Sequence, residues 1–197
     1  MAEKDRLSML TWLIDRYDVL RVAISRRAAI VLSADAILVT ATVFLFGKFL
    51  GGYSDAPETT GTGEKYMIAL IIIFAVTAIG LLSLSIISAT YSIVNVWIKS
   101  HELTGEDTPR IYFLHARDTY EDLKDFTSFR KKLADTTDDD MLKYAEAELW
   151  RVTVATYYRH ADLRRAIQFL YYAIFPFFMT LLIYSIIVAI SFFGHAG

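Results

Sequence analysis

The sequence predicts an all-α integral membrane protein with three transmembrane helices and a small cytoplasmic helical bundle between spans two and three. Three apolar runs carry this prediction, at residues 28–50, 66–98 and 167–193. A helix rises about 1.5 Å per residue and the hydrocarbon core is about 30 Å thick, so about 20 apolar residues cross it. Each run exceeds that length. The charged residues gather between the runs, a segregation that is not typical of soluble globular chains.

The distribution of lysine and arginine predicts the orientation of the spans. Six of these residues precede the first run, twelve lie between the second and third runs, and Lys65 alone lies in the loop 51–65. Cytoplasmic loops of membrane proteins carry an excess of lysine and arginine. We therefore expect the N-terminus and residues 99–166 to face the cytoplasm, and the loop 51–65 and the tail 194–197 to face outward. The first apolar run starts too late to belong to a cleavable signal peptide.

The segments that flank the first two spans predict helical extensions of those spans. Residues 1–27 read as a cytoplasmic amphipathic helix, because their apolar residues recur near helical spacing with charges between them. This segment contains no proline or glycine, so we expect the helix to run directly into the first span. The run 66–98 is longer than a membrane requires, and its end is expected to project into the cytoplasm.

The cytoplasmic segment 99–166 predicts two further helices. A short one is expected at about residues 118–134, where an apolar stripe recurs at helical spacing. Thr137 followed by Asp138–Asp140 is typical of a helix start, because a threonine side chain caps the first turn and carboxylates favour the positive end of the helix dipole. From Met141 no breaker precedes Pro176, so one helix is expected to enter the third span, with a kink at Pro176.

Asp35 is an acidic residue inside the first predicted span. A charged side chain costs about 2.5–3.5 kcal/mol at the bilayer centre on insertion scales. Asp35 lies about two turns from the cytoplasmic end of the first span. It therefore either meets headgroups, water or Arg26 and Arg27, or it faces a polar seam or pore between subunits.

Small polar residues recur along the second predicted span with gaps of three, four or eight residues, which predicts that they share one helix face. Such faces let helices approach closely and form hydrogen bonds across the contact. The face either packs inside one protomer or forms a subunit interface or the wall of a polar pathway. Its members are Thr77, Ser85, Ser88, Ser92 and Asn95.

Basic residues cluster at the predicted cytoplasmic ends of the first and third spans. Such clusters attract anionic lipid headgroups at about 1 kcal/mol per cation. Arginine also forms two-point contacts with phosphate, so the same residues could hold a nucleotide. The cluster consists of Arg26, Arg27, Arg159, His160, Arg164 and Arg165.

The composition excludes several classes of function. The chain has no cysteine, which excludes disulfides, thiolate metal sites and a cysteine nucleophile. The four histidines show no metal-ligand spacing, and no hydrolase, metalloprotease or nucleotide-binding glycine motif is present. We therefore expect no enzyme activity, no catalytic residue, no metal, no cofactor and no nucleic-acid partner.

Several segments resemble the Pycsar effector transmembrane (PycTM) family of prokaryotic antiphage membrane effectors. The first is RRAAIVLSADAILVTATVF, which begins at Arg26 and places Asp35 where many relatives carry asparagine. The second is YEDLKDFTSFRKKLAD, followed by a long helix, the basic YYRHADLRRA and a final span. The resemblance covers residues 18–190 and rests on layout and loose motifs. Some relatives carry a cyclic-nucleotide-binding domain, and this chain has no segment that could form one.

The resemblance implies an effector of the prokaryotic inner membrane. A nucleotide second messenger or a partner protein would activate it, and copies of the chain would assemble in the lipid bilayer and disrupt membrane integrity or potential. The infected cell would then stop growing. Because a cyclic nucleotide domain is missing, either the small helical bundle binds the signal or a signal-generating partner protein delivers it. The alternative is a membrane scaffold or sensor that couples a cytoplasmic partner to the membrane without permeabilising it.

Overall fold

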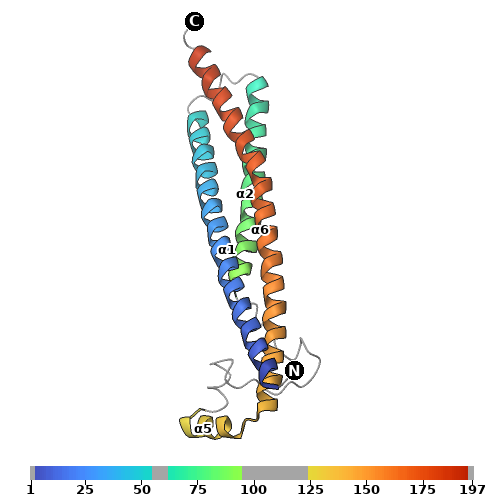
Figure 1. Ribbon diagram of the computed structural model, residues 1–197. Coiled ribbons are helices and arrows are strands. Elements are labelled where there is room, and N and C mark those ends of the chain that lie inside the picture. Colours follow the sequence, from blue (N-terminus) through green and yellow to red (C-terminus); the bar gives the residue numbers. More distant parts are fainter. Residues whose placement is uncertain (1–2, 55–61, 95–123, 195–197) are drawn as a thin grey trace. The chain divides into compact units, whose positions relative to one another are not determined.

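The computed structural model describes residues 3–54, 62–94 and 124–194, and every regular element in these ranges is an α-helix. Three of the helices are long and apolar enough to cross a membrane, which confirms the predicted all-helical class and its three candidate spans. The helices are α1 (Glu3–Ser54), α2 (Thr62–Ile93), α5 (Phe126–Asp135) and α6 (Asp138–Gly194) (Figure 1).

The helix boundaries agree with the longest predictions and extend them. α1 joins the N-terminal amphipathic segment to the first apolar run and continues past it to Ser54. α6 runs unbroken from Asp138 through Pro176 to Gly194, as the absence of earlier breakers predicts. The predicted cytoplasmic projection of the second run begins at Tyr91; α2 includes it as far as Ile93, and the part from residue 95 onward lies outside the described residues.

The chain divides into two compact units, and α1 and α6 contribute residues to both. The first unit comprises residues 1–23 and 95–159, and the second comprises residues 24–94 and 160–197. Most of the three apolar runs falls in the second unit.

In the second unit, α2 buries one narrow face whose successive members lie four or three residues apart. This alternation is the heptad pattern of coiled coils, which keeps one stripe of a helix against its neighbours. We call this stripe the α2 seam. Its buried members are Ile71, Ala75, Ala78, Leu82, Ser85, Ala89 and Ser92.

Small residues let the three helices of the second unit approach one another closely. Ala28 of α1, Ala89 of α2 and Ala166 of α6 are all fully buried in one cluster with Ile24 and Leu163. An alanine on each helix leaves little side chain between the backbones, which is the packing mode of membrane helices. Further along the unit, Phe74 of α2 meets Phe175 of α6 edge to face, with ring centroids 6.5 Å apart.

The second unit distributes polarity in the opposite sense to a soluble protein. Large apolar side chains face outward from all three helices, including Ile37, Ile87 and Phe178. Fully or nearly fully buried polar residues lie between the helices instead, at Asp35 and four hydroxyl side chains. This arrangement is favourable in lipid, because hydrocarbon solvates apolar groups but offers no hydrogen-bond partners. Polar groups are therefore more stable inside the protein.

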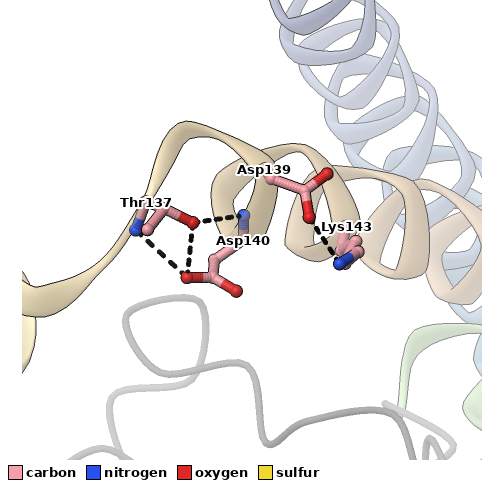
Figure 2. Close-up of polar contacts among 4 residues, drawn as sticks. All are labelled: Thr137, Asp139, Asp140 and Lys143. Atoms are coloured by element: carbon pink, nitrogen blue, oxygen red, sulfur yellow. Dashed lines mark hydrogen bonds and ion pairs between the residues drawn. The ribbon is translucent and has the colours of Figure 1, made fainter.

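In the first unit, α6 begins with a reciprocal capping arrangement (Figure 2). The backbone N–H of Asp140 donates to Thr137 Oγ1 over 3.2 Å, and the Thr137 backbone N–H donates to Asp140 Oδ2 over 3.1 Å. The Thr137 hydroxyl also donates to Asp140 Oδ2 over 2.7 Å. One turn further on, Lys143 pairs with Asp139. The predicted helix start is therefore confirmed, with aspartate in the place that glutamate takes in a capping box.

Removing this cap should loosen the first turns of α6. Because Thr137 satisfies a backbone donor of the first turn, Thr137→Ala is expected to cost about 1 kcal/mol. Hydrogen exchange of the amides of residues 138–145 would measure the loss. Lys143→Ala is the matched control, since its exposed ion pair contributes far less. Equal losses in both variants would contradict the capping role.

The same cap predicts a pH dependence with a definite sign. Hydrogen bonds from Thr137 lower the pKa of the Asp140 carboxyl below its ordinary value of 3.8. A carboxyl whose pKa is depressed by folding stabilises the folded form above the unfolded pKa and loses that contribution as the pH falls. Protection of the first turn should therefore decline below about pH 4, and Asp140→Asn should remove that part of the decline.

α5 begins at Phe126, which is later than the sequence predicts. Asp125 has extended backbone angles, and its Oδ1 accepts a hydrogen bond from the Ser128 backbone N–H over 2.9 Å, so it is the N-cap. Lys124 has a φ of 52°, in the left-handed region, so it is not part of the right-handed helix that follows. The remainder of the predicted helix start, residues 118–123, lies outside the described residues.

Apolar packing and a surface ion pair join α1 to α6 in the first unit. Leu10 of α1 is buried with Leu142 and Ala145 of α6, and partly buried leucines border them. Arg6 forms a salt bridge with Glu146 at the surface. Deeper in the unit, Glu148 is 6 % exposed. The first unit therefore combines a coiled-coil-like apolar contact with a buried carboxylate.

Candidate functional site

The second unit contains one polar cluster to which α1, α2 and α6 each contribute. Asp35 and Ser85 are fully buried, and Ser85 Oγ lies 2.8 Å from Asp35 Oδ2. The same Ser85 oxygen lies 3.0 Å from the backbone carbonyl oxygen of Ala166. We call these three residues the interhelical cluster. It is the candidate functional site, because buried polar groups within membrane spans generally serve function or specific helix association.

The heptad spacing explains why these residues meet. Ser85 belongs to the α2 seam, and Asp35 lies seven residues beyond Ala28 on the buried face of α1. Ala166 is in the alanine-rich contact of α6, where the absence of a large side chain exposes its carbonyl oxygen to a neighbouring helix. Asp35 therefore faces the interior of one protomer in the second unit. Neither Arg26 nor Arg27 forms an ion pair with it in the described part of the chain.

The other buried hydroxyls behave differently from Ser85. Thr42 donates to the Leu38 carbonyl over 2.7 Å, and Ser92 donates to the Ala89 carbonyl over 2.7 Å. Each bond lies within a single helix, so these hydroxyls have a hydrogen-bond acceptor without contacting a neighbouring helix. Among the hydroxyls of the described residues of α1, α2 and α6, the Ser85 hydroxyl alone lies within hydrogen-bond distance of two other helices.

The predicted polar face of the second span is divided by the structure. Ser85 and Ser92 are buried in the α2 seam, and Ser88 is half-buried beside it. Thr77 is exposed and donates to the carbonyl of Ile73, so it lies off this face. Eight residues separate Thr77 from Ser85, and at 3.6 residues per turn this gap rotates a side chain by about 80°. Asn95 lies outside the described residues.

The predicted basic cluster also separates. Arg26, Arg27, His160 and Arg164 are exposed in the second unit. Arg165 is exposed there as well, and its guanidinium lies 3.4 Å from the carboxylate of Asp162. These exposed basic side chains are free of any large desolvation cost and can contact an anion at a membrane surface.

Arg159 belongs to the first unit and has a different environment. Its side chain is buried, and burial lowers the pKa of its guanidinium, with the positive charges of Arg21 and Arg151 acting in the same direction. The ordinary pKa of arginine is so high that the group remains charged. Sequence reasoning grouped Arg159 with the exposed basic residues, because the sequence alone does not show which neighbouring residues of one helix are buried.

Sequence reasoning missed two buried polar groups, one in the interhelical cluster and one in the first unit. The Ala166 carbonyl carries no side-chain signal, because backbone acceptors are the same at every residue. Glu148 lies in a segment rich in charged residues, and only its spacing of three or four residues from Ala145 and Val152 could have indicated burial. Within the described residues, no group of histidine, cysteine and carboxylate side chains is arranged to hold a metal ion.

Comparisons of the chain with protein-family models, with characterised proteins and with solved structures find no match. The chemistry of the site therefore rests on the residues themselves. The interhelical cluster holds one carboxyl, one hydroxyl and one carbonyl, a set that can bind a proton and join helices.

Proposed function

We propose that this chain is a membrane effector of antiphage defence. On activation by a nucleotide second messenger or a partner protein, several copies assemble and disrupt the integrity or potential of the prokaryotic inner membrane, which arrests the infected cell. The resemblance of the segments around Asp35 and Arg164 to the PycTM family supports this proposal. The interhelical cluster is the structural observation that supports it most directly.

The cluster supports a protein with a quiet form and an active form. Within the second unit, the polar groups of the spans face one another and the apolar groups face outward. A bilayer tolerates that arrangement without being perturbed. Disruption therefore requires either that the three helices rearrange, so that Asp35 and Ser85 reach water, or that further copies contribute to the pathway. Three helices alone are too few to surround a wide pore.

Two glycines support assembly into a homo-oligomer. Gly47 and Gly51 are four residues apart on α1, and both are exposed. An added Cβ at either position meets no atom within 4 Å, so packing inside the described chain does not require glycine there. Pairs of small residues at this spacing let membrane helices from different chains approach closely.

In the proposed orientation, the exposed basic side chains of the second unit lie at the cytoplasmic surface. Arg26, Arg27, His160, Arg164 and Arg165 would then contact anionic headgroups or the phosphate of an activating nucleotide. The N-terminus would be cytoplasmic and the C-terminus outward, as the excess of lysine and arginine in the segments before and between the spans favours.

The decisive test is membrane potential, read with a voltage-sensitive dye in cells that express the chain with and without its neighbouring operon genes. We expect depolarisation only when the activating signal is present. The double substitution Gly47→Leu with Gly51→Leu should abolish it, because bulk at both glycines blocks close approach. Val43→Leu is the matched control, since Val43 is also exposed on α1, one turn earlier, and should leave depolarisation unchanged.

A different outcome would identify the alternative function. If the chain is inserted in the membrane, the signal is present and the potential still does not change, membrane disruption is wrong. Cytoplasmic proteins that purify with the chain would then favour a scaffold or sensor.

A further inference from the structure

The interhelical cluster has two hydrogen-bond contacts but only one hydroxyl proton, that of Ser85, to occupy them. Ser85 Oγ lies within hydrogen-bond distance of two oxygens, Asp35 Oδ2 at 2.8 Å and the Ala166 carbonyl at 3.0 Å. A serine hydroxyl carries one proton, and a carbonyl oxygen carries none. An ionised carboxylate also carries none. With Asp35 ionised, one of the two contacts would therefore bring two acceptor oxygens together without a proton between them.

We propose that Asp35 is a buried proton-binding site: its carboxyl group is neutral, its O–H donates to Ser85 Oγ, and the Ser85 hydroxyl donates to the Ala166 carbonyl. This chain of two hydrogen bonds runs from α1 through α2 to α6 and gives each contact its own proton. The inference concerns the closed second unit and does not depend on the proposed membrane-disrupting function.

The second oxygen of the Asp35 carboxyl independently favours the neutral form. Asp35 Oδ1 is buried and has no hydrogen-bond partner in the described part of the chain. An ionised carboxylate shares its charge between both oxygens, so it would leave half of its charge buried and unpaired, at high cost. In the neutral form Oδ1 is a carbonyl oxygen, whose missing hydrogen bond is much less costly.

No cation compensates for a charge at this position. In the described residues, Asp35 has a single hydrogen-bond partner, Ser85, and no ion pair. Along the same helices, Arg26, Arg27, Arg164 and Arg165 have exposed side chains. The residues that pack with Ala166, the third member of the cluster, include Ala28, Ala89 and Leu163 and are apolar. A proton is therefore the partner that neutralises the Asp35 carboxyl group without a cationic side chain or a further ligand.

Infrared spectroscopy of the full chain in lipid nanodiscs at neutral pH tests the proposal directly. A neutral carboxyl group has a C=O stretching band separate from that of carboxylates, and exposed carboxyls are ionised at this pH. We expect this band in the wild-type protein and its loss in Asp35→Asn. Absence of the band from folded wild-type protein would overturn the proposal. A band that persists unchanged in Asp35→Asn would overturn it too, since another carboxyl group would then be the neutral one.

The energetics of paired variants provide a second readout. Asp35→Asn retains an N–H donor toward Ser85 and should keep the wild-type folding equilibrium within about twofold, whereas Asp35→Leu removes the donor. Interhelical hydrogen bonds in membranes average about 0.6 kcal/mol and reach about 1.7 kcal/mol, so Asp35→Leu and Ser85→Ala should each lower the folding equilibrium constant by about threefold to twentyfold.

Two residues on the same buried faces serve as matched controls. Thr42→Val and Ser92→Ala each remove a buried hydroxyl that bonds only within its own helix, at Leu38 and Ala89 respectively. Both should leave the equilibrium nearly unchanged. If Asp35→Asn destabilises the second unit as strongly as Asp35→Leu does, an O–H donor without charge is not what the site requires, and the proposal is wrong.

Discussion

Ala89→Leu is expected to prevent close packing of the three long apolar helices. Ala89 is fully buried among Ile24, Ala28 and Ala166, so three added carbon atoms have no space to occupy. Overpacking of this kind costs about 1–3 kcal/mol, and in the second unit it would also draw Ser85 away from Asp35. The loss would appear as a lower unfolding midpoint of the purified chain in detergent.

Gly80→Leu is the matched control for this variant. Gly80 lies on α2, two to three turns from Ala89, and an added Cβ there meets no atom within 4 Å. The larger side chain would project outward, and we expect little change in the unfolding midpoint. If the two leucine variants lose equal stability, the alanine contact does not set the distance between the helices.

Glu148→Ala is expected to be the most destabilising charge deletion in the first unit. Glu148 is 6 % exposed, and its Oε2 accepts a hydrogen bond from Arg151 Nε over 2.7 Å. Removing a buried carboxylate leaves its partner's charge without compensation, which costs about 2–3 kcal/mol when that partner is partly solvated. Hydrogen exchange across residues 138–159 would report the loss as faster exchange.

The surface pair two residues earlier provides the comparison. Glu146 forms a salt bridge with Arg6, and both side chains are substantially exposed. Exposed pairs contribute about 0–1 kcal/mol, so Glu146→Ala should change exchange only slightly. A larger effect at Glu146 than at Glu148 would contradict the assignment of the buried carboxylate as the main polar contributor.

Much of the helical framework follows from the sequence, because its causes are local. Lengths of apolar runs, the absence of glycine and proline before Gly47, and the Thr137 cap depend on neighbouring residues only. These features predict α1 and the start of α6. The start of α5 was less predictable, since Asp125 lies within the apolar stripe but caps the helix, which therefore begins only at Phe126.

The site was harder to predict because its causes are not local. The sequence singled out Asp35 and Ser85, but no pattern connects positions fifty residues apart. Their meeting depends on which faces of α1 and α2 pack, and the heptad spacing of small residues on both helices is the signal that could have indicated it. The third partner, the Ala166 carbonyl, is backbone and carries no signal in sequence.

The heptad spacing of the α2 seam also raises a problem of register. A seam that repeats every seven residues would pack almost as well if α2 slid by one repeat, about 10 Å along its axis. A slide in one direction would place Ala78 opposite Asp35 and forfeit the hydrogen bonds. A slide in the other direction would place Ser92 opposite Asp35. It would also move the apolar segment of α2 out of alignment with a bilayer of fixed thickness. The single polar contact and the membrane together therefore select one alignment, which apolar packing alone would leave degenerate.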